Sequence, residues 1–347
     1  MPSLQSPPQA TLSGNSVAAP TVTDVIPEKT PSAVPQSATV NELVRYALDN
    51  INKDRKANGL IAVSIGRNTA SQKHAEDMLN NGYFSHWGLD GMKPYMRYTL
   101  AGGLNYEAEN AFMTATKWYG STDTPYKRDP LEMLDEAEAS LMESPGHRAN
   151  ILNKWHTMVN IGLAHSNDSL FLVQQFEGDY ISFTAVPILK SGALSVSGNT
   201  LQGFTVKQIQ LWHDQMPHEL TRGQLGATHS YDAGTPTAFI RPSAPPGAYY
   251  SESEAYYTWE TGVDPYSIPA DTPAPDRPNS TETNISHGGA VRWIDAKQWK
   301  VTGSSFSIEA DLSQILTKFG KGVYTVRIWG SRNTESICLS CYTIFHR

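Results

Sequence analysis

Several features that often decide the class of a protein are scarce in this sequence. Of its 347 residues only two are cysteine and 18% are charged, and the formal net charge is -7. The sequence has no cluster of Lys and Arg, and because phosphate binding needs a basic face, a nucleic-acid partner is excluded. No apolar run approaches the roughly 18 residues that cross a bilayer, so we expect no transmembrane segment in this chain.

The beginning of the chain also lacks the features of a folded or membrane-inserting segment. Residues 1–38 are rich in Pro, Ala, Ser and Thr without helical or strand periodicity, and they have neither the basic region nor the apolar region of a signal peptide. This composition is typical of a tether left on an exported protein after its signal is removed. We therefore expect a disordered tether over residues 1–38 and a location outside the cell or on its surface.

The two cysteines, Cys338 and Cys341, form a CxxC pattern in "ICLSCY". A redox CxxC normally opens a helix, whereas this one lies in an apolar run that predicts a strand. Without a second CxxC, a structural zinc site is not expected. Residues three apart in a regular strand face opposite sides, so a local disulfide and two ordinary buried thiols both stay open.

Helical periodicity begins abruptly at Thr39. "TVNELVRYALDNINKDRKANGL" predicts a helix that ends at Gly59. A second helix is predicted to begin near Thr69, and a third covers "DPLEMLDEAEASLME", with Asp129 as its cap and Pro130 at its first position.

Alternation with a period of two replaces the helical pattern after about residue 160. Two strands joined by a Ser-Asn-Asp turn follow the helices, which predicts an α+β domain over residues 39–186. Residues 187–347 contain short strands separated by Gly, Pro and Asn, which predict a β-rich, sandwich-like C-terminal domain of unknown family. The Pro- and Tyr-rich stretch at about 242–287 predicts an irregular insert.

Four motifs of the first domain occur in a distinctive order: "HAEDMLNNGYFSHWGLDG", "AENA", "LMESPGHRANIL" and "LVQQF". Together they resemble the CAP superfamily (cysteine-rich secretory, antigen 5, pathogenesis-related 1), in particular its prokaryotic SCP-like branch. The resemblance implies an α-β-α sandwich with a shallow cleft that holds two His and two Glu and binds a divalent metal through the histidines. Eukaryotic members are rich in disulfides, and the absence of cysteine from this region fits a prokaryotic exported protein.

The resemblance assigns three of the cleft residues by motif. His86 and His147 correspond to the metal-binding histidines, and Glu109 corresponds to the first glutamate, preferred to Glu107 on motif register. The family usually has Gly-Glu-Asn where this chain has Ala-Glu-Asn. His147 is expected to be presented by a Pro-Gly turn.

The second cleft glutamate is chosen by a physical argument. Glu138 lies on the apolar stripe of its predicted helix, where an ionised carboxylate is costly unless it is paired, whereas Glu143 points to the polar side. We therefore prefer Glu138 to Glu143. Asn110 and Arg148 are expected to support the site.

This constellation admits more than one chemistry. Two neutral imidazoles from separate segments can hold Zn²⁺ or a similar ion and leave positions open for water, although two protein ligands make a weak site. The alternative is that the four groups form a hydrogen-bonded network that locks the helices to the sheet.

Three functions follow in order of preference. The first is an exported or surface-held binding module whose cleft takes a small hydrophobic, lipid, glycan or peptide ligand, with the C-terminal domain contacting a cell-envelope partner. The second is a metal-dependent hydrolase, a peptidase or cell-wall enzyme, with Glu109 or Glu138 as general base. The third is a structural envelope protein.

Overall fold

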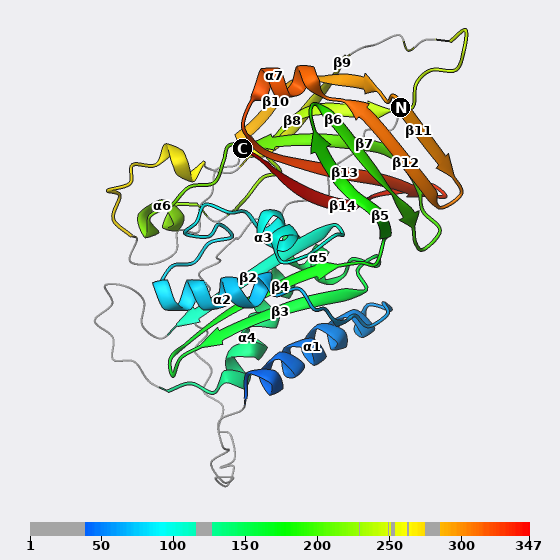
Figure 1. The fold of residues 1–347 in the computed structure, drawn as a ribbon. Coiled ribbons are helices and arrows are strands. Elements are labelled where there is room, and N and C mark those ends of the chain that lie inside the picture. The colour runs from blue at the N-terminus through cyan, green and yellow to red at the C-terminus, as the bar shows by residue number, and fades with distance from the viewer. Residues whose placement is uncertain are drawn as a thin grey trace.

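The structure, a computed structural model, describes most of the chain in two layered assemblies (Figure 1). The described residues are 39–115, 127–228, 230–248, 250, 254–261, 264–274 and 285–347. The predicted tether, residues 1–38, lies outside them. Among the described helices, none combines the length and the apolar character needed to cross a membrane.

Residues up to about 177 form a three-layer α-β-α sandwich, which confirms the predicted fold of the first domain. Its sheet has the order β1-β3-β4-β2, in which only β1 and β3 are parallel. The strands are β1 (Ser64–Ile65), β2 (Glu107–Ala115), β3 (Met158–His165) and β4 (Ser169–Glu177). Helices α1 (Val40–Ala57) and α4 (Pro130–Glu143) lie below the sheet in Figure 1, and α2 (Ala70–Asn81) and α3 (Pro94–Leu100) lie above it.

The helix ends follow the local signals in the sequence. Thr39 and Glu42 form a capping box at the start of α1, and the Asp129 side chain accepts a hydrogen bond from the Leu131 backbone N–H at the start of α4. Gly82 ends α2 in the left-handed conformation, with φ 63°, which glycine adopts without a steric penalty.

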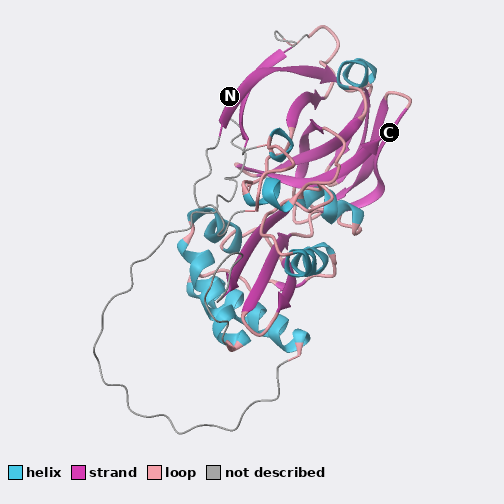
Figure 2. Cartoon of the chain, turned by 90° about the vertical axis from the view of Figure 1, so that its left-hand side faces the viewer, coloured by secondary structure: helices cyan, strands magenta, loops and turns pink. Residues whose placement is uncertain are grey.

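The remaining chain forms two sheets packed face to face, which confirms the predicted β-rich region (Figure 2). One sheet has the order β14-β13-β7-β8-β10-β9 and the other β11-β12-β6-β5. The strands are β5 (Ile181–Lys190), β6 (Ala193–Thr200), β7 (Thr205–Asp214), β8 (Thr235–Arg241), β9 (Glu254–Thr261), β10 (Ile285–Asp295), β11 (Gln298–Thr302), β12 (Ser305–Asp311), β13 (Gly322–Arg332) and β14 (Glu335–His346). Short helices α6 (Arg222–Gly226) and α7 (Ser313–Phe319) and the 3-10 helix η1 (Pro265–Ser267) lie in the connections.

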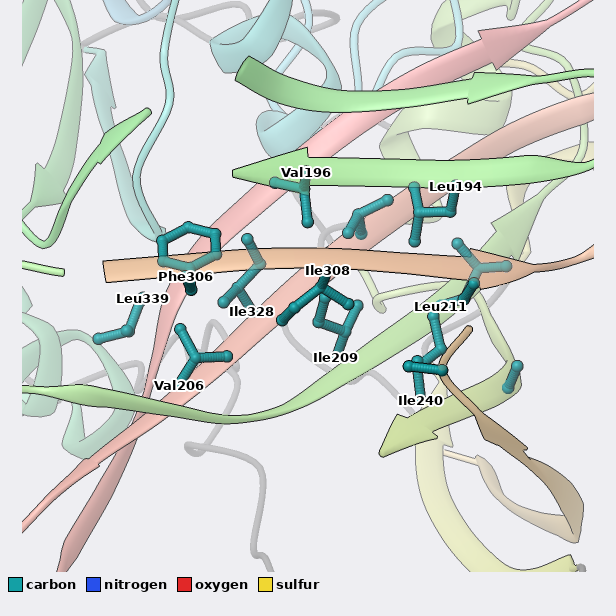
Figure 3. Packing of buried hydrophobic residues seen from close by; sticks show 14 of the residues in the cluster. Leu194, Val196, Val206, Ile209, Leu211, Ile240, Phe306, Ile308, Ile328 and Leu339 are labelled. Carbon is teal, nitrogen blue, oxygen red and sulfur yellow. The ribbon is translucent and has the colours of Figure 1, made fainter. Parts of the chain in front are cut away.

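An apolar core fills the space between the two sheets (Figure 3). It includes Val206, Ile209 and Leu211 of β7, Val326 and Ile328 of β13, and Val196, Phe306 and Ile308 of the facing sheet. Because side chains alternate along a strand, the neighbouring residues of β13 point away from this core. Val323 and Trp329 instead pack against the first domain, through Tyr95 and Tyr106 respectively.

Two details of the C-terminal part differ from the sequence-based expectations. The stretch 242–287, expected to be irregular, contains strand β9, which pairs with β10 in antiparallel register. The expected boundary at residue 186 falls within β5, which pairs with β6 of the sandwich along its length. β9 pairs with the next strand of the chain across an intervening stretch, 262–284. β5 forms a tight hairpin with β6, with only Ser191 and Gly192 between them, so the domain boundary lies before β5.

Buried polar contacts join the two parts of the molecule. Lys93 Nζ lies 2.7 Å from Asp214 Oδ1 and also pairs with Asp232, and the Tyr95 hydroxyl donates to Asp214 Oδ2 at 2.7 Å. Lys93 is only 3% exposed. Burial would lower the pKa of Lys93, but the two carboxylates overcome this effect and raise it, so the amine stays charged within the interface.

Candidate functional site

His86 and Glu109 form a buried pair at the centre of the predicted site. His86 Nδ1 lies 2.9 Å from Glu109 Oε1, and the two side chains are 0% and 1% exposed. Arg97 Nη2 approaches both oxygens of Glu109, at 3.3 and 3.2 Å, and its Nη1 donates to the His86 carbonyl at 2.9 Å. Arg97 therefore holds both members of the pair in place.

Glu109 is ionised in this environment. Burial would raise its pKa, but the charge of Arg97 and the hydrogen bond from His86 hold the pKa of Glu109 below its ordinary value. A carboxylate at Nδ1 fixes the tautomer in which Nδ1 carries the proton. The lone pair of a neutral His86 then lies on Nε2, which is the arrangement found in carboxylate-supported metal histidines.

Glu138 and His147 belong to a second network. Glu138 Oε2 accepts from Gln174 Nε2 at 2.8 Å, and Gln174 Oε1 in turn accepts from Asn110 Nδ2 at 3.1 Å. Asn110 Nδ2 also donates to the His147 backbone carbonyl at 3.2 Å, and Asn110 Oδ1 accepts from Asn150 Nδ2 at 2.8 Å. Asn110 therefore anchors α5 (Pro145–Ile151), the helix that carries His147, to the sheet.

The two networks lie on opposite faces of β2, because Glu109 and Asn110 are consecutive residues of one strand. β2 is an edge strand of its sheet. The contact between the two networks is electrostatic: a charge on His86 lowers the pKa of His147. The structure thus brings His86 and Glu109 into direct contact, places His147 within electrostatic reach of His86, and joins Glu138 to the His147 helix only through Gln174 and Asn110.

Burial shifts the pKa values of His147 and Glu138 away from those of exposed side chains. Burial, with a smaller effect from His86, lowers the pKa of His147 to about 3, so this imidazole is neutral at physiological pH. Burial raises the pKa of Glu138 to about 7, although the hydrogen bond from Gln174 opposes the rise. The two glutamates therefore differ, since Glu109 is ionised and Glu138 titrates near neutrality.

Three polar atoms of the site lack a hydrogen-bond partner within the described part of the chain. They are His86 Nε2, His147 Nε2 and Glu138 Oε1, all buried. Such atoms are uncommon in folded proteins, and a site that receives a ligand, an ion or water accounts for them. The described residues contain no group of three or more His, Cys, Asp or Glu side chains arranged to hold a metal. An ion here would rest on the two imidazoles and on water.

The C-terminal part contributes Tyr231 to this site. The ring of Tyr231 lies 5.1 Å from the ring of His86. Two bonds secure the flanking backbone: Trp87 Nε1 donates to the Ser230 carbonyl at 3.0 Å, and Ser85 Oγ donates to the Thr228 carbonyl at 2.5 Å. The connection between α6 and β8 therefore covers the His86 side of the cleft.

A polar cavity of about 360 Å³ lies beside Tyr231, between the two parts of the molecule. Aromatic and acidic side chains line it together, among them Trp87, Tyr266, Asp214 and Asp232.

Other predicted residues occupy different surroundings. Glu107 accepts from Gln175 Nε2 at 3.2 Å, and burial raises its pKa well above the ordinary value. Arg148 is exposed and donates to the Met142 carbonyl at 3.3 Å, so it supports the end of α4 rather than the cleft. The expected Pro-Gly turn before His147 is instead the first turn of α5, with Pro145 at its first position.

Three residues of the site escape sequence reasoning. Gln174 has a signal, because it is polar within the otherwise apolar "LFLVQQF" and is 0% exposed in β4. Arg97 lies among aromatic residues whose pattern indicates only packing. Tyr231 reaches the cleft from 145 positions after His86, and no local pattern predicts that approach.

Comparison with known proteins supports the assignment of the first domain. Residues 48–176 match the model of the cysteine-rich secretory protein family (CAP). An extracellular protein with an SCP domain from Bacillus anthracis is similar in structure, with 19% identity and a TM-score of 0.31. The match covers 42% of this chain and 45% of that chain, so this chain spans less than half of that protein's length. An outer surface protein from Borrelia burgdorferi has 17% identity and a TM-score of 0.31, over 42% of this chain and 98% of that chain. No curated protein matches the sequence.

Proposed function

We propose that this chain, whose residues 48–176 are a CAP domain, is an exported or surface-held binding protein. Its ligand would enter the cleft around the edge of β2. The observation that carries the proposal is the set of three buried atoms without partners in the described residues, His86 Nε2, His147 Nε2 and Glu138 Oε1. Buried polar atoms normally have hydrogen-bond partners. These three are already removed from water, so a ligand that bonds to them gains hydrogen bonds without a further desolvation cost on the protein side.

The chemistry of the surroundings narrows the ligand class. Tyr231 continues from the cleft into the cavity of about 360 Å³, where Trp87 and Tyr266 offer aromatic surface beside Asp214 and Asp232. Aromatic faces combined with hydrogen-bonding carboxylates suit a glycan or a peptide better than an acyl chain. We therefore favour a glycan or peptide ligand, consistent with an envelope location.

A divalent ion such as Zn²⁺ is the proposed aid to that binding. Within the described residues, Nε2 of both imidazoles has no hydrogen-bond partner, and Glu109 binds His86 through its other ring nitrogen, Nδ1. With only two protein ligands, the ion would bind weakly and keep positions for water or ligand atoms. When bound, it would supply Lewis-acid polarisation of a ligand oxygen.

Calorimetric titration of chelator-treated protein tests the proposal. The probes are Zn²⁺ alone, and soluble peptidoglycan fragments with and without Zn²⁺. The key variant is His147→Gln, because it removes one free Nε2 while leaving the buried His86 pair intact. His156→Gln is the matched control, since His156 is also buried with a free Nε2 among the described residues but stacks on Phe176 at the other end of α5.

We expect the wild type and His156→Gln to bind alike, and His147→Gln to lose about tenfold or more in affinity. Equal affinities in all three proteins would place the binding elsewhere. If none of the probes binds at millimolar concentration, the binding proposal fails and the cleft is a structural network.

The separation of the two glutamates favours a second candidate, a hydrolase. Pairs of carboxyl groups with pKa values driven apart are typical of acid and base partners, and here Glu109 is held ionised while the pKa of Glu138 is about 7. Turnover of the same peptidoglycan fragments or of a peptide library, lost in Glu138→Gln while Zn²⁺ affinity is kept, would establish an enzyme. If the wild type shows no turnover with metal present, the hydrolase hypothesis fails and only the binding function remains.

A further inference from the structure

An irregularity in strand pairing brings the two cysteines onto one face of the sheet. On β14, Cys338 lies opposite Trp329, but Ser340 lies opposite Ile328, so Leu339 is an extra residue in the ladder. Cys341 consequently lies opposite Arg327. Residues 327 and 329 share a face of β13, and the bulge therefore places both cysteines on that face as well.

This arrangement corrects the expectation from a regular strand. Three-residue spacing predicts opposite sides, yet the two Sγ atoms are 3.6 Å apart, the distance of a nonbonded contact. Both cysteines are free thiols, 5% and 3% exposed, and they pack with Trp329 and the ring of Tyr106 from the first domain. A shift of each sulfur by less than an ångström would bring the pair to the length of a disulfide, about 2.05 Å.

Arg327 supplies the charge that a thiolate at this position needs. Its guanidinium stacks on Trp212, 4.9 Å from the ring, and within the described residues it forms no ion pair with a carboxylate. Its Nε has no hydrogen-bond partner there either. A partly buried cation without a carboxylate favours an anion nearby, and the side chain directly across the ladder is Cys341.

The electrostatics of the thiols agree with this placement. Burial would raise the pKa of Cys341, but the hydrogen bond with the Cys338 thiol and the charge of Arg327 hold the pKa of Cys341 below its ordinary value. Burial raises the pKa of Cys338. The two thiols are therefore unequal, with Cys341 as the nucleophile and Cys338 as the second thiol.

We propose that Cys338 and Cys341 are a redox-active dithiol that closes to a local disulfide across the β14 bulge by exchange with a small disulfide. The Cys341 thiolate attacks one sulfur of the external disulfide, forming a mixed disulfide and releasing one thiolate. Cys338 then loses its proton, and its thiolate attacks the Cys341 sulfur and releases the second. Two electrons pass from the cysteines to the external disulfide, which leaves as two thiols.

The position of β14 provides the access that the exchange requires. β14 is the terminal strand of the six-stranded sheet, paired with β13 on one side, so it can open locally without separating a central strand. Its bulge also touches the CAP domain: the Tyr106 backbone N–H donates to the Leu339 carbonyl at 3.0 Å, next to the start of β2. Closure of the disulfide would therefore act where the sandwich meets the strand that carries Glu109.

Mass spectrometry of the full chain after incubation in glutathione buffers of increasing oxidation tests the proposal. We expect both thiols to become unreactive to an alkylating agent in one two-electron step, with a product two hydrogen atoms lighter and no dimer. In Cys338→Ser the second attack is impossible, so Cys341 should accumulate as a mixed disulfide with glutathione. In Arg327→Met the pH midpoint of the oxidation rate should rise by about one unit.

Matched variants keep the test decisive. Arg332→Met removes another arginine of β13, stacked on Trp155 at 4.3 Å, and should leave the pH midpoint unchanged. Arg327→Lys keeps a charge if Arg327→Met does not fold, and should shift the midpoint less. The proposal is overturned if both thiols stay reactive in fully oxidised glutathione, including at mild urea concentrations that open edge strands, or if oxidation yields only intermolecular dimers.

Discussion

The two faces of β13 carry side chains of opposite chemistry, although both are largely buried. Tyr324, Val326 and Ile328 enter the apolar core between the two sheets, whereas Thr325 and Arg327 point toward the first domain. The core face gains its stability from apolar area removed from water. The opposite face buries polar groups, several of them without partners among the described residues, and so gains less from burial.

This difference indicates which region of the molecule holds side chains capable of binding or chemistry. The sandwich core consists almost entirely of apolar side chains, while the surface between the two parts holds the Lys93 cluster, Tyr231 and the cysteine pair. This polar interface continues through Tyr231 to His86 in the first domain. Four predictions separate the two regions, beginning with the largest effect.

Removing the Lys93 cation from the interface should lower the free energy of unfolding most. In Lys93→Met, Asp214 and Asp232 would remain as two neighbouring acidic groups without their shared counterion. Breaking a buried ion pair from one side costs about 3–5 kcal/mol, and we expect this loss in the free energy of unfolding measured in urea. Lys297→Met, at an exposed pair with Asp311, is the control and should change it by less than about 1 kcal/mol. A small loss in both variants would mean that the interface contributes little to stability.

Truncating a side chain on the core face of β13 should cause the second-largest loss of stability. Ile328 is 0% exposed within the sandwich core. We expect Ile328→Ala to lower the free energy of unfolding by about 2–5 kcal/mol, because it removes buried methyl groups and leaves a cavity. A loss below about 1 kcal/mol would show that the two sheets repack around the gap.

Lowering the pH should weaken the polar region and leave the apolar core unaffected. His147 has a pKa of about 3 in the folded protein and about 6.5 when unfolded, so between these values the unfolded chain binds more protons and stability falls as the pH falls. Between pH 7 and pH 5 this amounts to about 2 kcal/mol. The loss over this range should be smaller by that amount in His147→Gln, whereas Ile328→Ala should retain the loss of the wild type. Identical losses in His147→Gln and the wild type would contradict the burial effect.

The smallest effect is expected from the polar face of β13. Thr325 is fully buried, and its hydroxyl has no partner among the described residues. Thr325→Val replaces the hydroxyl by a methyl group of similar size, so thermal unfolding should show a change within about 1 kcal/mol or a slight gain. A loss of more than about 2 kcal/mol would reveal a hydrogen bond to buried water at this position.

The sequence predicts those parts of the fold that depend on nearby residues. The caps of α1 and α4 and the Gly82 end of α2 arise from contacts within one turn, and their sequence signals match the structure. The burial of Glu138 follows in the same way, because its position on the apolar stripe of a helix points it to the core, and it is 6% exposed. The hairpin of β3 and β4 follows from alternation and one turn.

By itself, then, the sequence determined the sandwich of the first domain and the β-rich character of the second, and it proposed the cleft residues by motif. Only the tertiary structure decided that β9 pairs with β10, that Tyr231 covers His86, and that a bulge at Leu339 brings Cys338 beside Cys341. The physical reason is the same in each case. Register between strands and contact between domains depend on a second segment of the chain, and the pattern along one strand contains no record of how that segment pairs or packs.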